Sequence, residues 1–157
     1  MAEQELERLP IPDELLLREG QNVILNDDLN VEHGQKATLT FEIPGVLGQR
    51  YVNTYLNGSI RDETTKKRLT DPAIRIEFIK LFKPKEDGGR GLDVDLVMQG
   101  SPYWQDIVGT GELASMLAAK ERIAANTTLE IGIENVSPDT DYDVSITLLG
   151  EMRFTRE

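Results

Sequence analysis

The chain has 157 residues, of which 28 are acidic and 17 are basic, so its formal net charge is −11 at pH 7. It contains no cysteine and one histidine, His33, which excludes disulfide frameworks, thiolate zinc sites, iron–sulfur clusters and cysteine nucleophiles. The acidic balance argues against a nucleic-acid binder, because affinity for phosphate depends on clustered Lys and Arg. Apolar residues make up 39% of the chain, which is enough for a packed core.

Targeting signals are not recognisable in the sequence. No apolar run approaches the roughly 20 residues that a membrane helix needs. The first ten residues, MAEQELERLP, lack the basic-then-apolar pattern of a signal peptide. We therefore expect a protein made in reducing cytoplasm, with no membrane partner, no nucleic acid, no metal and no cofactor.

Residues 1–21 are predicted to form an N-terminal arm in front of a β-sandwich domain that spans residues 22–157. Pro10 and Pro12 prevent a continuous helix and favour extended backbone just before each of them. The arm is nevertheless too apolar for a tail left in water. We expect it to dock, either on its own domain or on a neighbouring molecule. The predicted interface residues are Leu6, Leu9, Ile11, Leu15, Leu16 and Leu17.

From about residue 22 the apolar side chains alternate with polar ones, which is typical of antiparallel strands with one buried face. Segments 37–43, 129–134 and 142–148 follow this pattern, with Leu129, Ile131 and Ile133 facing the same interior as Val144, Ile146 and Leu148. In segment 92–98, Leu92, Val94, Leu96 and Met98 are expected inward, and Asp93 and Asp95 outward. Residues 22–31, 50–56 and 74–82 are further strand candidates, and 74–82 is apolar on both faces. The fold class is therefore all-β, an antiparallel sandwich of jelly-roll or Greek-key type.

Two segments interrupt the strands in this interpretation. Asn57-Gly58 is predicted to be a two-residue hairpin turn, because both central positions of such a turn need positive φ. Residues 111–122 are predicted to form the one substantial helix, with Leu113, Met116 and Leu117 at helical spacing. We expect this helix to cross between the two sheets.

The sequence offers little that could carry out catalysis. Asp139, Asp141 and Asp143 alternate as the first ligands of a calcium loop do, but the glycine and glutamate of that loop are missing, which favours a solvated turn. His33 lies in a polar turn without any nucleophile motif. The basic stretch 66–68 is interleaved with nearby acids, so a phosphate site there is not well supported. We therefore expect a protein that is not an enzyme.

Adjacent aromatic residues, Tyr103 and Trp104, lie in the polar segment SPYWQD. In an exposed loop they would serve to stack on a sugar or to anchor a protein interface. The alternative is that they close one end of the sandwich as a plug. Both interpretations remain open from the sequence.

Residues 122–153 carry a pattern of strand and turn residues, namely Asn126, Thr127, Leu129, Ile131, Ile133, Asn135 and Ser137, followed by Leu148 and Gly150. This pattern resembles the C-terminal half of small β-sandwich accessory proteins in tailed bacteriophage particles. Ala125 replaces the proline of that family, and Glu151 follows the glycine where a charged or aromatic residue is usual. The resemblance covers about a fifth of the chain.

The resemblance implies a capsid-associated structural role. We expect a virion protein (decoration, cement or minor capsid protein) that is assembled in the host cytoplasm and located on the capsid surface. It would form a homo-oligomer and bind the major capsid protein or another virion protein. The alternative is a carbohydrate- or receptor-binding β-sandwich module that uses Tyr103 and Trp104. A small hydrolase on a sandwich scaffold is a third interpretation.

Overall fold

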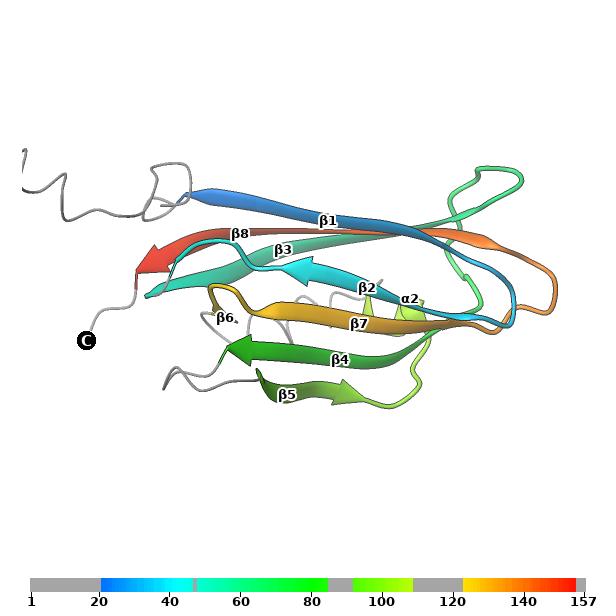
Figure 1. Cartoon of the computed structure of the whole chain (residues 1–157). Coiled ribbons are helices and arrows are strands. Elements are labelled where there is room, and N and C mark those ends of the chain that lie inside the picture. The colour runs from blue at the N-terminus through cyan, green and yellow to red at the C-terminus, as the bar shows by residue number, and fades with distance from the viewer. Residues whose placement is uncertain (1–20, 47, 85–91, 109–122, 155–157) are drawn as a thin grey trace, which may run out of the picture.

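The computed structural model describes residues 21–46, 48–84, 92–108 and 123–154. They form two four-stranded antiparallel sheets that pack face to face, which confirms the predicted β-sandwich (Figure 1). Residues 1–20 of the expected arm, including its six apolar interface residues, lie outside the described residues. The predicted helix at 111–122 lies outside them as well, and the described helix is the four-residue α2 (Trp104–Ile107).

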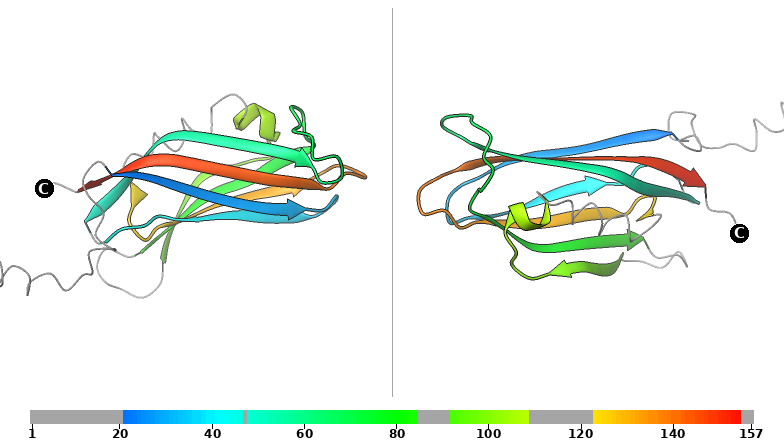
Figure 2. Two further views of the ribbon diagram at one scale, coloured as in Figure 1. Left: turned by 90° about the horizontal axis from the view of Figure 1, so that it is seen from above. Right: turned by 180° about the vertical axis from the view of Figure 1, so that it is seen from behind.

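The two sheets combine early and late strands of the chain. The first sheet has the order β1 (Asn22–Val31), β8 (Tyr142–Phe154), β3 (Gln49–Asp62) and β6 (Ile123–Ala124). The second has the order β2 (Lys36–Glu42), β7 (Thr128–Asn135), β4 (Ile74–Pro84) and β5 (Leu92–Gln99). The pairing is nested: β1 pairs with β8, β2 with β7, β3 with β6 and β4 with β5. Seen from above, β1, β8 and β3 lie side by side as one layer (Figure 2, left).

The inner faces of both sheets form the core, as the alternating pattern predicted for most strands. Leu129, Ile131 and Ile133 of β7 are fully buried, and so are Ile146 and Leu148 of β8. Their polar neighbours lie on the outer faces, where a strand can keep contact with water. The alternation of apolar and polar residues therefore predicted the buried side of both strands correctly.

The strand β4 looks apolar on both faces because a bulge changes the face of its inward residues. Ile76 lies opposite Ile133, but the register shifts so that Phe78 lies opposite Gly132 and Ile79 opposite Ile131. Ile74, Ile76, Ile79 and Leu81 are therefore all buried. Phe78 lies on the outer face over Gly132, where an added Cβ would meet the Phe78 ring at 2.2 Å. A bulge that re-aims a strand in this way is a common device in sheets.

The expected hairpin turn at Asn57-Gly58 is wrong. β3 continues through both residues, which lie opposite Thr147 and Ile146 of β8. Because Ile146 points inward, Gly58 occupies an inward position, and an added Cβ there would lie 2.7 Å from Cζ2 of Trp104. The glycine thus provides space for a neighbouring ring, rather than the positive φ of a turn.

The expected orientation of segment 92–98 is also wrong in the residues whose exposure is defined. Val94 and Leu96 are 56% and 45% exposed, and they lie opposite Phe82 and Lys80 on the outer face. Asp95, expected outward, lies opposite the buried Leu81 and forms an ion pair with Lys83 at 3.4 Å. β5 is an edge strand, so the inward side of Asp95 is close enough to solvent to hold this pair.

The open side between β1 and β2 is closed by a polar contact between the sheets. Asp27 lies opposite Ile146, on the inward side of the edge strand β1. Its Oδ2 accepts a hydrogen bond of 2.8 Å from the backbone N–H of Thr40 in β2. An inward-pointing charge on an edge strand also disfavours pairing with foreign strands.

Candidate functional site

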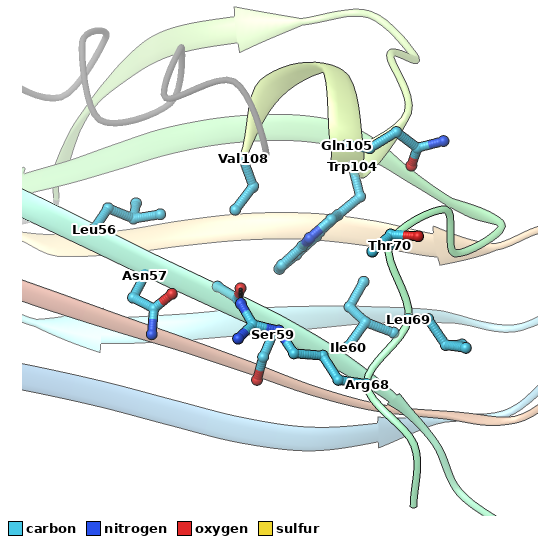
Figure 3. A pocket seen from close by; sticks show the side chains of 11 residues that line it. Leu56, Asn57, Ser59, Ile60, Arg68, Leu69, Thr70, Trp104, Gln105 and Val108 are labelled. Carbon is cyan, nitrogen blue, oxygen red and sulfur yellow. Dashed lines mark hydrogen bonds between the residues drawn. The ribbon is translucent and has the colours of Figure 1, made fainter. Parts of the chain in front are cut away.

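The candidate site is a pocket of about 460 Å³ at the side of the sandwich opposite β1 (Figure 3). It is bounded by residues 56–60 of β3, by residues 68–70 of the segment between β3 and β4, and by three residues around α2, namely Trp104, Gln105 and Val108. Its volume falls within the range of small-ligand sites. Three parts of the chain that are distant in sequence therefore meet here.

Trp104 forms one wall of the pocket and packs onto β3. Its ring edge and Cγ1 of Val108 occupy the space that a side chain at residue 58 would fill, at 2.7 and 2.6 Å from an added Cβ. Trp104 is 4% exposed, so neither face of its indole is open for stacking on a sugar. Of the two alternatives from the sequence, this burial favours the plug, although the ring closes the side of the sandwich and not one of its ends.

Tyr103 fixes the start of α2 against β4. Arg75 lies over its ring at 4.2 Å from the centroid, and a guanidinium nitrogen donates a hydrogen bond of 3.1 Å to the Tyr103 hydroxyl. The backbone N–H of Ile76 also donates to the carbonyl of Pro102 at 2.9 Å. The two neighbouring aromatic residues therefore have different roles: Tyr103 anchors the segment to β4, and Trp104 closes the sandwich.

Arg68 reaches the pocket because a tight turn brings the chain back to β3. The Asp62 Oδ1 accepts hydrogen bonds from the backbone N–H groups of Thr64 and Thr65, at 2.8 and 3.0 Å. Lys66 then adopts a positive φ of 62°, which reverses the chain direction. After this turn the N–H of Leu69 donates to the carbonyl of Ile60 at 2.8 Å.

Along the edge of β3 that borders the pocket, peptide groups of the strand point into the pocket. A guanidinium nitrogen of Arg68 lies 3.4 Å from the Gly58 carbonyl, a long hydrogen bond. The adjacent side chains of Lys66, Lys67 and Arg68 are exposed and make this border of the pocket basic. The Lys66 ammonium is engaged with Asp143 of β8 at 3.1 Å. The basic stretch predicted from the sequence is therefore part of the pocket border, through Arg68.

Three aspartates, Asp139, Asp141 and Asp143, lie at the end of the sandwich. One of them, Asp141, links its own loop to the loop that contains His33. Asp141 Oδ1 accepts hydrogen bonds from the backbone N–H of His33 at 2.8 Å and contacts its Nδ1 at 2.7 Å. The backbone N–H of His33, followed by its side chain, holds the pKa of Asp141 below its ordinary value. Hydrogen bonding from Asn30, followed by Lys66, likewise lowers the pKa of Asp143. Within the described part of the chain, no group of three acidic or histidine side chains is placed to hold a metal ion.

The outer face of the first sheet carries a row of apolar side chains close to the start of β1. Ile24 lies opposite Leu149, and Leu149 lies opposite Tyr55. Ile24 is 68% exposed and Tyr55 is 56% exposed. The predicted arm ends directly before this strand, so the row is next to the point where the arm joins the domain.

Family models, curated proteins and solved structures give no match to this chain. None of the helices in the described ranges is long and apolar enough to cross a membrane. The site must therefore be interpreted from its own geometry.

Sequence reasoning identified Trp104 as a candidate, assigned Gly58 to a turn and considered Arg68 only as part of the basic stretch 66–68. The signal for Gly58 was present, because Leu56, Gly58 and Ile60 continue the period of a strand with one small inward position. The Asn-Gly dipeptide outweighed it in the interpretation. For Arg68 no local signal exists, since its role depends on the return of the chain to β3.

Proposed function

We propose that this protein is a non-enzymatic structural component of a virus particle, which forms homo-oligomers and binds the capsid lattice in a decoration, cement or minor capsid role. The observation that carries the proposal is the nested pairing of eight strands in two sheets. We infer from this order that the sandwich is a jelly roll, a fold used by viral capsid proteins, by lectins and by cupins.

The residues of the chain favour the capsid role among these three uses. Cupin-type metal sites need several histidines, and the chain has one. A sugar-stacking site needs an open aromatic face, whereas Trp104 is 4% exposed and Arg75 covers Tyr103. The alternative function, a carbohydrate- or receptor-binding module, therefore has less support from the pocket.

The apolar row formed by the exposed Ile24 and Tyr55, with the half-buried Leu149 between them, supports a role in assembly. Large exposed apolar side chains that lie next to one another are typical of interaction surfaces. The row adjoins the arm, whose leucines are the predicted interface. A surface strand face and a terminal arm together are well suited to connect molecules within a shell.

The test is to follow the protein in particles purified by density gradient from the cells that produce it. An antibody against the chain should detect it in the band that contains the capsid protein, at a fixed ratio to that protein. Detection only in the free protein at the top of the gradient would contradict the proposal. A specific and saturable signal on a glycan array would favour the alternative function.

A further inference from the structure

The pocket beside Trp104 borders an open stretch of strand edge. β3 pairs with β8 along one side, but on its other side it pairs with β6 only at Arg50 and Tyr51. Alternate residues of an antiparallel strand direct their peptide groups to the same side. The carbonyl of Ile60 accepts a bond from Leu69 on the pocket side, so the peptide groups of Leu56 and Gly58 point there too. No strand of the described ranges pairs with these two residues on this side.

Three features of this border match what an extended peptide requires. Open N–H and C=O groups of a sheet edge give affinity by strand addition, and pockets for alternate side chains give specificity. Trp104 and Val108 provide an apolar wall next to the edge. Arg68 places a positive charge beside the Gly58 carbonyl, where it would meet an acidic side chain of the incoming segment.

We propose that this pocket binds the N-terminal arm of a second copy of the chain, which adds to the edge of β3 as an extended strand around residues 9–13. This inference rests on the proposed assembly role and names the contact that produces it. The arm has six acidic and two basic residues in positions 1–20, a net charge of −4, which is opposite in sign to Arg68 in the pocket lining.

The sequence of the arm fits an edge strand. Pro10 and Pro12 lack an N–H group, so in an added strand they belong on the side that faces away from β3. Leu9, Ile11 and Asp13 then direct their N–H groups toward β3, because the alternation places them together. Two apolar side chains followed by an acid match a border made of Trp104, Val108 and Arg68.

The topology favours the arm of a second copy, rather than the arm of the same chain, as the segment that occupies the pocket. The arm joins β1 at Asn22, opposite Glu151, whereas Gly58 lies opposite Ile146, farther along the same sheet. To reach its own pocket, the arm would have to reverse at Gln21 and cross β8. An arm that continues outward reaches a neighbour without reversal, and the ten residues from Ile11 to Gly20 span up to about 33 Å when extended.

The experiment measures the native mass of the full-length chain, by mass spectrometry and by sedimentation, over a range of concentrations. The pocket variant is Arg68→Glu, and its matched control is Lys67→Glu, which makes the same charge change one residue away and outside the pocket lining. The arm variant replaces Leu9 and Ile11 by Asn. The proposal predicts that Arg68→Glu and the arm variant each weaken self-association by at least about tenfold, and that Lys67→Glu changes it by less than about threefold.

Mixing the two defective proteins tests exchange between copies. The pocket variant keeps an intact arm and the arm variant keeps an intact pocket, so the mixture should form a mixed dimer that neither protein forms alone. Failure of the mixture to associate would overturn the exchange. A synthetic peptide of residues 1–20 should also dissociate the wild-type oligomer, while a scrambled peptide should not, and this measurement needs no variant to fold.

The outcomes separate this inference from the proposed function. A wild-type chain that stays monomeric, or a loss of association with Arg68→Glu but not with the arm variant, overturns the inference. Presence in virus particles at a fixed ratio to the capsid protein is a separate result and depends on the capsid contact. The capsid role therefore survives or fails by the gradient experiment, whatever the result for the arm.

Discussion

Trp104 packs onto Gly58 so closely that Cζ2 of its indole lies 2.7 Å from where a Cβ at residue 58 would be. The contact joins α2 to the inner face of β3, on the side of the sandwich where β3 pairs with β6 only at Arg50 and Tyr51. The same residues form the wall and the border of the pocket. The smallest side chain of β3 and the chain's one tryptophan therefore determine the shape of the candidate site together.

Gly58→Ala should destabilise the fold by about 1–3 kcal/mol, the usual cost of overpacking a close contact. The new methyl group would meet both Trp104 and Val108. Chemical denaturation of this variant measures the cost. Ser59→Ala, on the outer face of the same strand, is the control and should stay within about 0.5 kcal/mol. Adding Val108→Ala should recover part of the loss, and equal stability of Gly58→Ala and wild type would show that this contact is loose.

Inward and outward residues of the two late strands should differ sharply in their effect on stability. Ile131 and Ile146 are fully buried, so truncating either to alanine should cost about 2–5 kcal/mol. Glu130→Ala and Ser145→Ala change the outer faces and should cost no more than about 0.5 kcal/mol. A denaturant series on the four variants decides this. If the outward pair proved as damaging, the outer faces would have to be buried by another molecule.

Asn135→Ala should cost about 2–4 kcal/mol, because the loss leaves one buried and one half-buried carbonyl without a donor. The Asn135 amide donates to the carbonyls of Val31 and Thr140 at 3.0 and 2.8 Å, and its oxygen accepts from the N–H of Ser137 at 2.9 Å. This fully buried side chain thus connects β7 to the end of β1 and to the loop between β7 and β8. Thermal and urea unfolding measure the loss. Asn57→Ala, the same change at an exposed position of β3, should be nearly neutral, and a similar loss there would contradict the assignment.

Acid should remove the stabilisation that Asp141 provides. Its pKa in the folded protein is below the ordinary value of 3.8, mainly because the backbone N–H of His33 donates to the carboxylate. The stabilisation is therefore complete above the unfolded pKa and is lost as pH falls through the folded pKa. We expect the difference in Tm between wild type and Asp141→Asn to shrink as pH falls from roughly 5 to 3. The control is Asp71→Asn, an exposed change in the segment between β3 and β4, and a difference that grows with acid would contradict the assignment.

The strands that were predicted well from the sequence are those in which every second residue is apolar and the residues between them are polar or glycine. In β7 and β8 the outward residues are polar or glycine, with Leu149 the exception, so only one face can be buried. In β4 a bulge after Ile76 exchanges the faces, and no local pattern distinguishes this from a strand buried on both sides. In β5 the alternation was real, but the apolar face at Val94 and Leu96 is the outer one. Alternation defines two faces without telling which of them meets the core.

The candidate site was harder to predict than the fold, because it is assembled over long distances in the sequence. Trp104 stood out by residue type alone. Gly58 was assigned to a turn, because its contact with Trp104 spans nearly fifty residues and leaves no local trace. Arg68 depends on a turn capped by Asp62, which brings it back to the strand that it left. Side-chain patterns within a strand are local, whereas a pocket between a strand edge and a helix is not.

The native mass of the full-length chain tests whether the protein assembles with copies of itself, as we propose. Sedimentation equilibrium at micromolar concentrations should give a discrete oligomer, with a mass that is a whole multiple of the 17.6 kDa chain. Higher salt should weaken the oligomer, because acidic and basic groups face each other in the proposed contact. A monomer at every concentration, unchanged by salt, would contradict self-assembly through the arm.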